Sequence, residues 1–136
     1  IAVTGGCQCG AVRYASSQLM DNAHICHCRM CQQAVGNVFA ALVGAPNDTL
    51  VWTRGEPAIF ASSDLADRGF CAACGTPLFY RGKDSPRTGF TIGSLDDPSL
   101  ARMCRSAWKA ATPLWTACSP CRTKARPRTT WSMKPR

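Results

Sequence analysis

The sequence predicts a mainly β domain made of short antiparallel strands. Three observations support this prediction. Runs rich in β-branched and aromatic residues recur about every ten residues, turn-forming residues separate them, and only one stretch is typical of a helix. At 136 residues the chain has the size of one domain, with a core that is large enough to fold but not generous. We expect residues 1–100 to form this domain and residues 101–136 to form an irregular basic tail.

Six runs are predicted to be strands because Val, Ile, Thr and aromatic side chains pack well on a pleated surface. In order along the chain they are AVRY (11–14), NVFAALV (37–43), TLVWT (49–53), AIFA (58–61), PLFYR (77–81) and GFTIG (89–93). The segments GAPND, RGEP and GKDSP lie between them and are rich in the residues that turns require. The helical candidate, RMCQQAV, follows Cys28 and lasts a turn or two.

The positive charge of the chain is concentrated in the tail. Residues 1–100 contain seven Lys and Arg against eight Asp and Glu, for a charge of −1. Residues 101–136 contain nine Lys and Arg and no acid, for a charge of +9, and the two parts give the +8 of the whole chain. A nearly neutral domain without a basic face is not expected to bind nucleic acid.

Residues 101–136 show neither strand alternation nor a helical period, and they mix Trp108, Trp115 and Trp131 with Pro and Arg. Three explanations stay open: a disordered basic tail, an RNA-binding arm, and the product of a frameshift. The third arises because the same codons, displaced by two bases, permit a more ordinary ending for a β domain. Resequencing the encoding DNA would distinguish it, since an intact frame near codon 101 excludes a frameshift.

The chain shows no sign of a membrane or secretory segment. No apolar run approaches the roughly 20 residues that span a bilayer, and no signal-peptide pattern precedes the first cysteine. We therefore expect a cytoplasmic protein that makes no contact with a membrane.

Two cysteine pairs predict a closed metal site. Cys7 and Cys9 lie two apart, so an extended backbone would point both thiols to one face. Cys71 and Cys74 form a C-x-x-C-G knuckle, whose glycine can adopt positive φ and turn backbone N–H groups toward sulfur. Four thiolates from two remote segments make a structural zinc site that supplements a modest core.

Two other interpretations of these pairs stay open. Disulfides suit an extracytosolic protein, although cysteines two residues apart bridge poorly. A redox C-x-x-C normally lies in a βαβ unit, which this sequence lacks.

A cysteine triplet predicts a second, open zinc site. Cys26, Cys28 and Cys31 supply three thiolates from one short segment and leave a fourth position free, as in catalytic zinc sites. His24 could close the site as a fourth ligand. The ring of His27 is expected to point to the opposite face, because it stands between ligands at i and i+2.

An open three-cysteine site favours chemistry on sulfur. A small-molecule thiol bound there would lose its proton and could add to an electrophilic carbon, and the reverse step would break the same carbon–sulfur bond. Arg29, inside the triplet, is a candidate counter-charge for a carboxylate or the thiolates, and equally a solvated surface residue.

Four motifs resemble, in order and spacing, the glutathione-dependent formaldehyde-activating enzyme family, also called the GFA or CENP-V/GFA domain. They are TGGCQCGAVRY, CHCRMCQQAVG, DRGFCAACGTPLFYRG and GSLDDP, and they span residues 4 to about 100. The family usually continues with a further strand and a Trp-containing segment, which the tail does not show.

The resemblance implies an Mss4-like β-tent fold with two Zn²⁺ per chain. It implies a structural zinc on Cys7, Cys9, Cys71 and Cys74 and a catalytic zinc on Cys26, Cys28 and Cys31. It also implies a carbon–sulfur lyase that acts on glutathione adducts, such as S-hydroxymethylglutathione formed from glutathione and formaldehyde.

A second function from a different class stays open. Zinc knuckles often serve as non-catalytic modules that bind a macromolecule, and a tail of charge +9 would add a salt-sensitive attraction to phosphate. Nucleic-acid binding that survives deletion of residues 101–136 would favour it.

Overall fold

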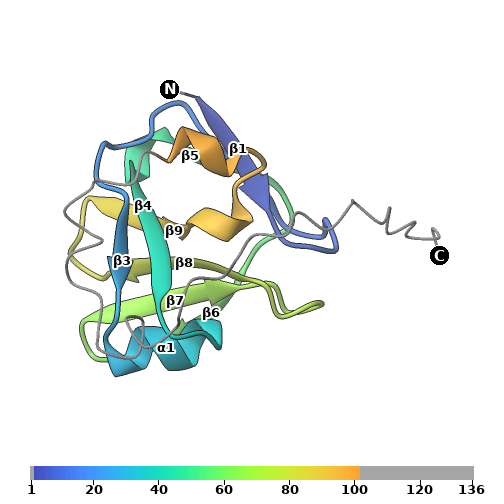
Figure 1. Cartoon of the computed structure of the whole chain (residues 1–136). Helices are drawn as coiled ribbons and strands as arrows, with labels where there is room; N and C mark the ends of the chain where they lie inside the picture. Colours follow the sequence, from blue (N-terminus) through green and yellow to red (C-terminus); the bar gives the residue numbers. More distant parts are fainter. Residues whose placement is uncertain (1, 102–136) are drawn as a thin grey trace, which may run out of the picture.

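The computed structural model describes residues 2–101, which form two antiparallel sheets and one short α-helix (Figure 1). A three-stranded sheet has the order β1-β2-β5, and a six-stranded sheet has the order β3-β4-β9-β8-β7-β6. The small sheet contains β1 (Val3–Gly6), β2 (Arg13–Ser16) and β5 (Leu50–Arg54). The large sheet contains β3 (His24–Cys26), β4 (Ala40–Pro46), β6 (Ala58–Ala61), β7 (Ala66–Phe70), β8 (Pro77–Gly82) and β9 (Arg87–Thr91).

Helical structure in the described residues is limited to short segments. The α-helix, α1 (Arg29–Val35), covers the run RMCQQAV that the sequence predicted, and Gly36 ends it in the left-handed conformation at φ 64°. Three 3₁₀ turns complete the fold: η1 (Asn47–Thr49), η2 (Ile92–Ser94) and η3 (Pro98–Leu100). None of these helices is long and apolar enough to cross a membrane.

The mainly β, antiparallel prediction is confirmed. All six predicted strands overlap observed ones, with shifts of a few residues at their ends. Three strands were missed: β1, β3 and β7, whose sequences VTGG, HIC and ADRGF are short or interrupted by glycine and charge. Their neighbours in the sheet determine their conformation more than their own propensity does.

The core lies between the two sheets, around the ring of Tyr14. This residue of β2 is 1% exposed and stacks on Phe90 of β9, with ring centroids 4.2 Å apart. Its hydroxyl is 2.8 Å from the hydroxyl of Ser94, so the buried polar tip is satisfied. Tyr14 therefore joins the small sheet to the large one.

The GSLDDP segment closes this core against the first strand. The Asp96 backbone N–H donates to the Thr4 carbonyl at 3.0 Å, and Leu95 pairs with Gly5. Arg13 and Thr4 also donate to the Asp96 carboxylate, and they hold the pKa of this carboxyl below its ordinary value. These contacts fix β1 in place just ahead of the first cysteine pair.

The large sheet has a second face that does not enter this core. Across five strands the register brings Phe60, Arg68, Tyr80, Gly89 and Gly44 into one row. The adjacent row contains the core residues Val43 and Phe90, so the first row points away from the core. Helix α1 lies at the end of β3 and β4 in Figure 1, and residues of this second face line the two cavities described below.

Candidate metal centres and adjoining cavities

Four thiols meet where β1 and β7 end. The Sγ atoms of Cys7, Cys9, Cys71 and Cys74 all lie within 4.8 Å of one another. The Cys7–Cys9 sulfur distance is 3.5 Å and the Cys9–Cys71 distance is 3.8 Å. Zinc–sulfur bonds of about 2.3 Å in a tetrahedron place sulfurs about 3.8 Å apart, whereas a disulfide needs about 2.05 Å. The donor set therefore fits a tetrahedral metal, and the seven cysteines among the described residues are free thiols.

The thiols converge through two tight turns. The Gly10 N–H donates to the Cys7 carbonyl at 3.1 Å, and the Gly75 N–H donates to the Cys71 carbonyl at 2.8 Å. Both glycines have positive φ, 77° and 76°, which a side chain would strain. A turn that ends at Gly10, not an extended backbone, therefore brings the Cys7 and Cys9 thiols together.

Hydrogen bonds favour the thiolate form of two of these sulfurs and lower the pKa of Cys7 and Cys74, whereas the neighbouring thiols raise the pKa of Cys9 to about 12. The Val12 N–H donates to Cys7 Sγ at 3.2 Å. The Thr76 hydroxyl, 3.1 Å from Cys74 Sγ, is the main cause that lowers the pKa of this thiol to about 5. A thiol that is already ionised at neutral pH is ready to bind a cation.

The cysteine triplet forms a second group at the other side of the sheet. Cys26 ends β3, Cys28 caps the N-terminus of α1, and Cys31 lies in its first turn, with the three sulfurs within 4.8 Å of one another. The Cys31 N–H donates to Cys28 Sγ at 3.4 Å and lowers the pKa of Cys28, whereas burial raises the pKa of Cys26 to about 11. No His, Asp or Glu among residues 2–101 joins the three sulfurs.

The two histidines lie outside this group. His24 Nδ1 is 2.9 Å from the Asn22 carbonyl, and its ring lines the cavity beside the sulfurs. His27 packs edge-on against Phe39, with ring centroids 5.9 Å apart.

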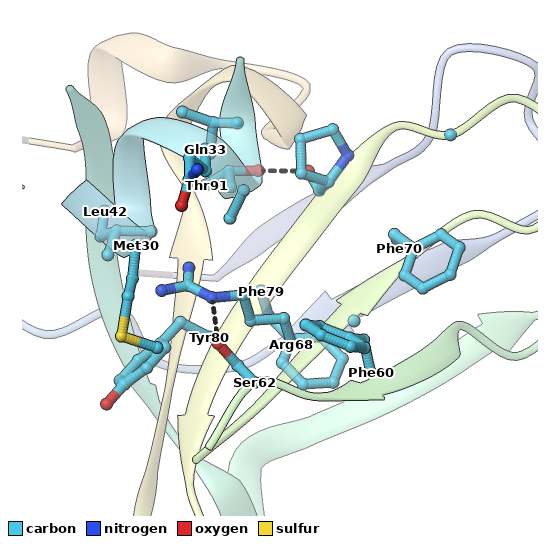
Figure 2. Close-up of a pocket in the computed structure, with 15 residues that line it drawn as sticks. Met30, Gln33, Leu42, Phe60, Ser62, Arg68, Phe70, Phe79, Tyr80 and Thr91 are labelled. Atoms are coloured by element: carbon cyan, nitrogen blue, oxygen red, sulfur yellow. Dashed lines mark hydrogen bonds between the residues drawn. The ribbon is translucent and has the colours of Figure 1, made fainter. Parts of the chain in front are cut away.

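A half-buried cation that the sequence interpretation missed contacts the triplet. Arg68 of β7 donates from Nη2 to Cys31 Sγ at 3.4 Å and from Nε to the Ser62 hydroxyl at 3.0 Å, and its guanidinium lies 5.0 Å from the centre of the Tyr80 ring. Figure 2 shows this guanidinium directed toward α1. Arg29, the candidate from the sequence, is exposed, and within residues 2–101 its side chain hydrogen-bonds to Gln32, its neighbour on the helix, at 3.3 Å and to no sulfur.

The triplet opens into a cavity of about 540 Å³. Arg68 and Arg87 line it, and no Asp or Glu of the described residues does. Two glycines of the sheet, Gly82 and Gly89, leave part of its floor without side chains, whereas the side chains of Asn22 and Met20 cover Gly44. The cavity therefore suits an anionic ligand that reaches the three sulfurs.

Arg68→Gln is expected to weaken zinc binding at the triplet 10- to 100-fold on an order-of-magnitude scale, as for other residues that hydrogen-bond metal ligands. The substitution removes the guanidinium that donates to Cys31 Sγ together with its positive charge, and the thiolate form of Cys31 is therefore disfavoured. Competition with a chelator, followed by native mass spectrometry, measures this change. Arg29→Gln is the matched control and should change affinity less than about threefold, since Arg29 does not touch a sulfur. Equal effects of the two substitutions would contradict the assignment.

Two comparisons with known proteins give a family and a similar fold. The family model described as glutathione-dependent formaldehyde-activating enzyme matches residues 2–118, further along the chain than the four motifs reach. A crystal structure of a Rhodobacter sphaeroides protein is 24% identical, with a TM-score of 0.57, over 74% of this chain and 96% of that chain. At this identity, the similarity supports the fold alone.

Proposed function

Because the chain belongs to the glutathione-dependent formaldehyde-activating enzyme family, we propose that it forms and cleaves the carbon–sulfur bond of a glutathione adduct at the cysteine triplet. The observation that carries this proposal is the contrast between the two sulfur groups. Four thiols lie close enough to hold a tetrahedral ion at one group, whereas three thiols face an open cavity at the other. The first group is then structural and the second holds the reacting thiol.

The donor sets support zinc at both groups. Zn²⁺ held by Cys26, Cys28 and Cys31 would supply one open position and lower the pKa of a thiol that binds there. The chain itself would supply charge and orientation: Arg68 offsets the negative charge of the sulfurs, and Arg68 and Arg87 attract the carboxylates of glutathione. The two glycines of the floor leave room for the peptide backbone of the ligand.

The proposed reaction is an addition to a carbonyl. The glutathione sulfur forms a bond to the carbon of formaldehyde, and the π electron pair moves to the oxygen. That oxygen takes up one proton, in balance with the proton that the thiol has released, and the product is S-hydroxymethylglutathione. Cleavage is the same sequence in reverse.

Exchange spectroscopy tests the proposal directly. Zinc-loaded protein of the full chain is expected to bind two zincs and to accelerate exchange between ¹³C-formaldehyde and S-hydroxymethylglutathione above the uncatalysed rate, measured by NMR. Removal of zinc with a chelator should return the exchange to that rate. A protein that holds two zincs and binds no glutathione would refute the proposal and favour the non-catalytic zinc module.

A further inference from the structure

A second cavity of about 510 Å³ adjoins the one beside the triplet. Figure 2 shows it between α1 and the second face of the large sheet. Its walls are rich in apolar and aromatic side chains, including Phe60, Phe70 and Tyr80. Four residues line both cavities and therefore form their common boundary: Met30, Leu42, Arg68 and Tyr80.

Formaldehyde is too small and too polar to fill this cavity. It contains two heavy atoms and no apolar substituent, whereas apolar cavities of about 300–1,000 Å³ bind much larger ligands. Large apolar side chains of the cavity walls are exposed to water: Phe60 is 60% exposed and Met30 is 47% exposed. A ligand that covers them would gain the free energy of apolar burial.

Two of the hydroxyls on the walls already have partners within the protein, whereas the Gln33 amide and the Tyr80 hydroxyl make no hydrogen bond to a described residue. The Ser62 hydroxyl accepts from Arg68, and the Thr91 hydroxyl donates to the Pro77 carbonyl at 2.7 Å. Most of the lining residues are apolar or aromatic, and aromatic rings offer favourable contacts to another ring. The walls are therefore complementary to an apolar, preferably aromatic, group.

Resting on the function proposed above, we propose that this cavity binds the aromatic or arylalkyl substituent of a larger aldehyde, whose adduct with glutathione is formed and cleaved at the triplet. The glutathione sulfur bonds to the carbonyl carbon, the π electrons move to oxygen, and a proton released by the thiol ends on that oxygen, giving a hemithioacetal. Arg68 stands at the boundary beside Cys31 Sγ, and its Nη1 makes no hydrogen bond to a described residue. Nη1 is thus available to the aldehyde oxygen.

Stable thioethers test the second cavity apart from the reaction. S-benzylglutathione carries a ring where S-methylglutathione carries one carbon, and calorimetry on the zinc-loaded full chain measures both affinities. We expect the benzyl compound to bind at least about tenfold more tightly, on the scale expected for burying one ring. Ala34→Phe, which fills the cavity from an exposed position on α1, should remove this preference.

A pair of neighbouring residues supplies the matched control. Phe60→Ala removes a ring from the wall and should reduce the preference, whereas Ile59→Ala should not. Ile59 is 51% exposed, next to Phe60, and lies on the opposite face of β6 outside the cavity.

Each outcome decides between the two proposals. A preference that Ala34→Phe and Phe60→Ala remove would support the inference. Equal affinities, or a preference that both variants leave unchanged, would overturn it while the glutathione function stands, and would mean that the cavity is filled by another segment or a second copy. If neither thioether binds, the inference fails; the glutathione function fails with it only if glutathione itself, measured in the same way, does not bind either.

Discussion

Cys71→Ser is expected to leave the chain mostly unfolded at 37 °C, the largest loss of stability for any single substitution considered. Cys71 is 1% exposed and belongs to the main core together with Cys7, Tyr14 and Phe90. Its sulfur lies among those of the other three cysteines that connect the end of β1 to the end of β7. One change would therefore remove a metal ligand and place a hydroxyl in the core.

The magnitude follows from the weight of a structural zinc in a small domain. Zinc binding by four such ligands is worth roughly 10–16 kcal/mol in peptides, whereas a whole domain is stable by about 5–15 kcal/mol. Loss of half of the zinc term, about 5–8 kcal/mol, would equal or exceed the whole stability of a domain at the lower end of this range. Far-UV circular dichroism during heating and native mass spectrometry measure the fold and the zinc content together.

Chelation of the wild-type chain provides the control for this substitution. Complete removal of zinc should lower the melting temperature to a value similar to that of Cys71→Ser, because both abolish the same four-ligand site. A Cys71→Ser chain that still melts cooperatively near the wild-type temperature would show that the four thiols do not hold a structural metal.

The sequence was sufficient to group the cysteines, because metal-binding spacing is local. Cys7 with Cys9, and Cys71 with Cys74, could be recognised within short motifs, and the closing of both pairs into one group required only that four thiolates complete a tetrahedron. The backbone around Cys7 could not be predicted from that spacing, because a turn and an extended segment can both present two sulfurs to one ion.

Arg68 could not be found from the sequence for a different reason. It lies 37 residues from Cys31, and its strand was not predicted, so no local pattern connected it to the triplet. Pairing of β7 with β8 and β6 brings Arg68 beside Tyr80 and under α1. The signal in the sequence was the alternation of apolar and polar residues in ADRGF, ahead of the C-x-x-C motif. Such alternation indicates a strand, but it does not say which strands pair with it.

The cavities could not be predicted from the sequence either, because they depend on how the strands are aligned across the sheet. Gly89 and Tyr80 become part of the floor of a site only when two separate strands are aligned. A glycine in a strand ordinarily suggests a bulge or the close approach of another backbone segment. The residues around it in the sequence do not indicate that it makes room for a ligand.

Cys31→Ser is expected to abolish carbon–sulfur exchange, with a loss on the order of 100-fold or more, while the chain stays folded with one zinc. The loss should exceed that for residues that only hydrogen-bond ligands, which is about 10- to 100-fold. Folding should survive because Cys31, 4% exposed, packs with Ala40 and Leu42 in a small cluster apart from the main core. The hydroxyl should cost only about 1–3 kcal/mol there.

The pair of cysteine substitutions separates the roles of the two sulfur groups. If the triplet is the reactive site and the four-thiol group is structural, Cys31→Ser lowers activity far more than melting temperature, and Cys71→Ser lowers the melting temperature first. Zinc content by mass spectrometry and exchange by NMR, measured on the same samples, give the comparison. Wild-type exchange in Cys31→Ser would exclude the triplet as the reactive site, and simultaneous loss of both zincs would show that the two groups are not independent.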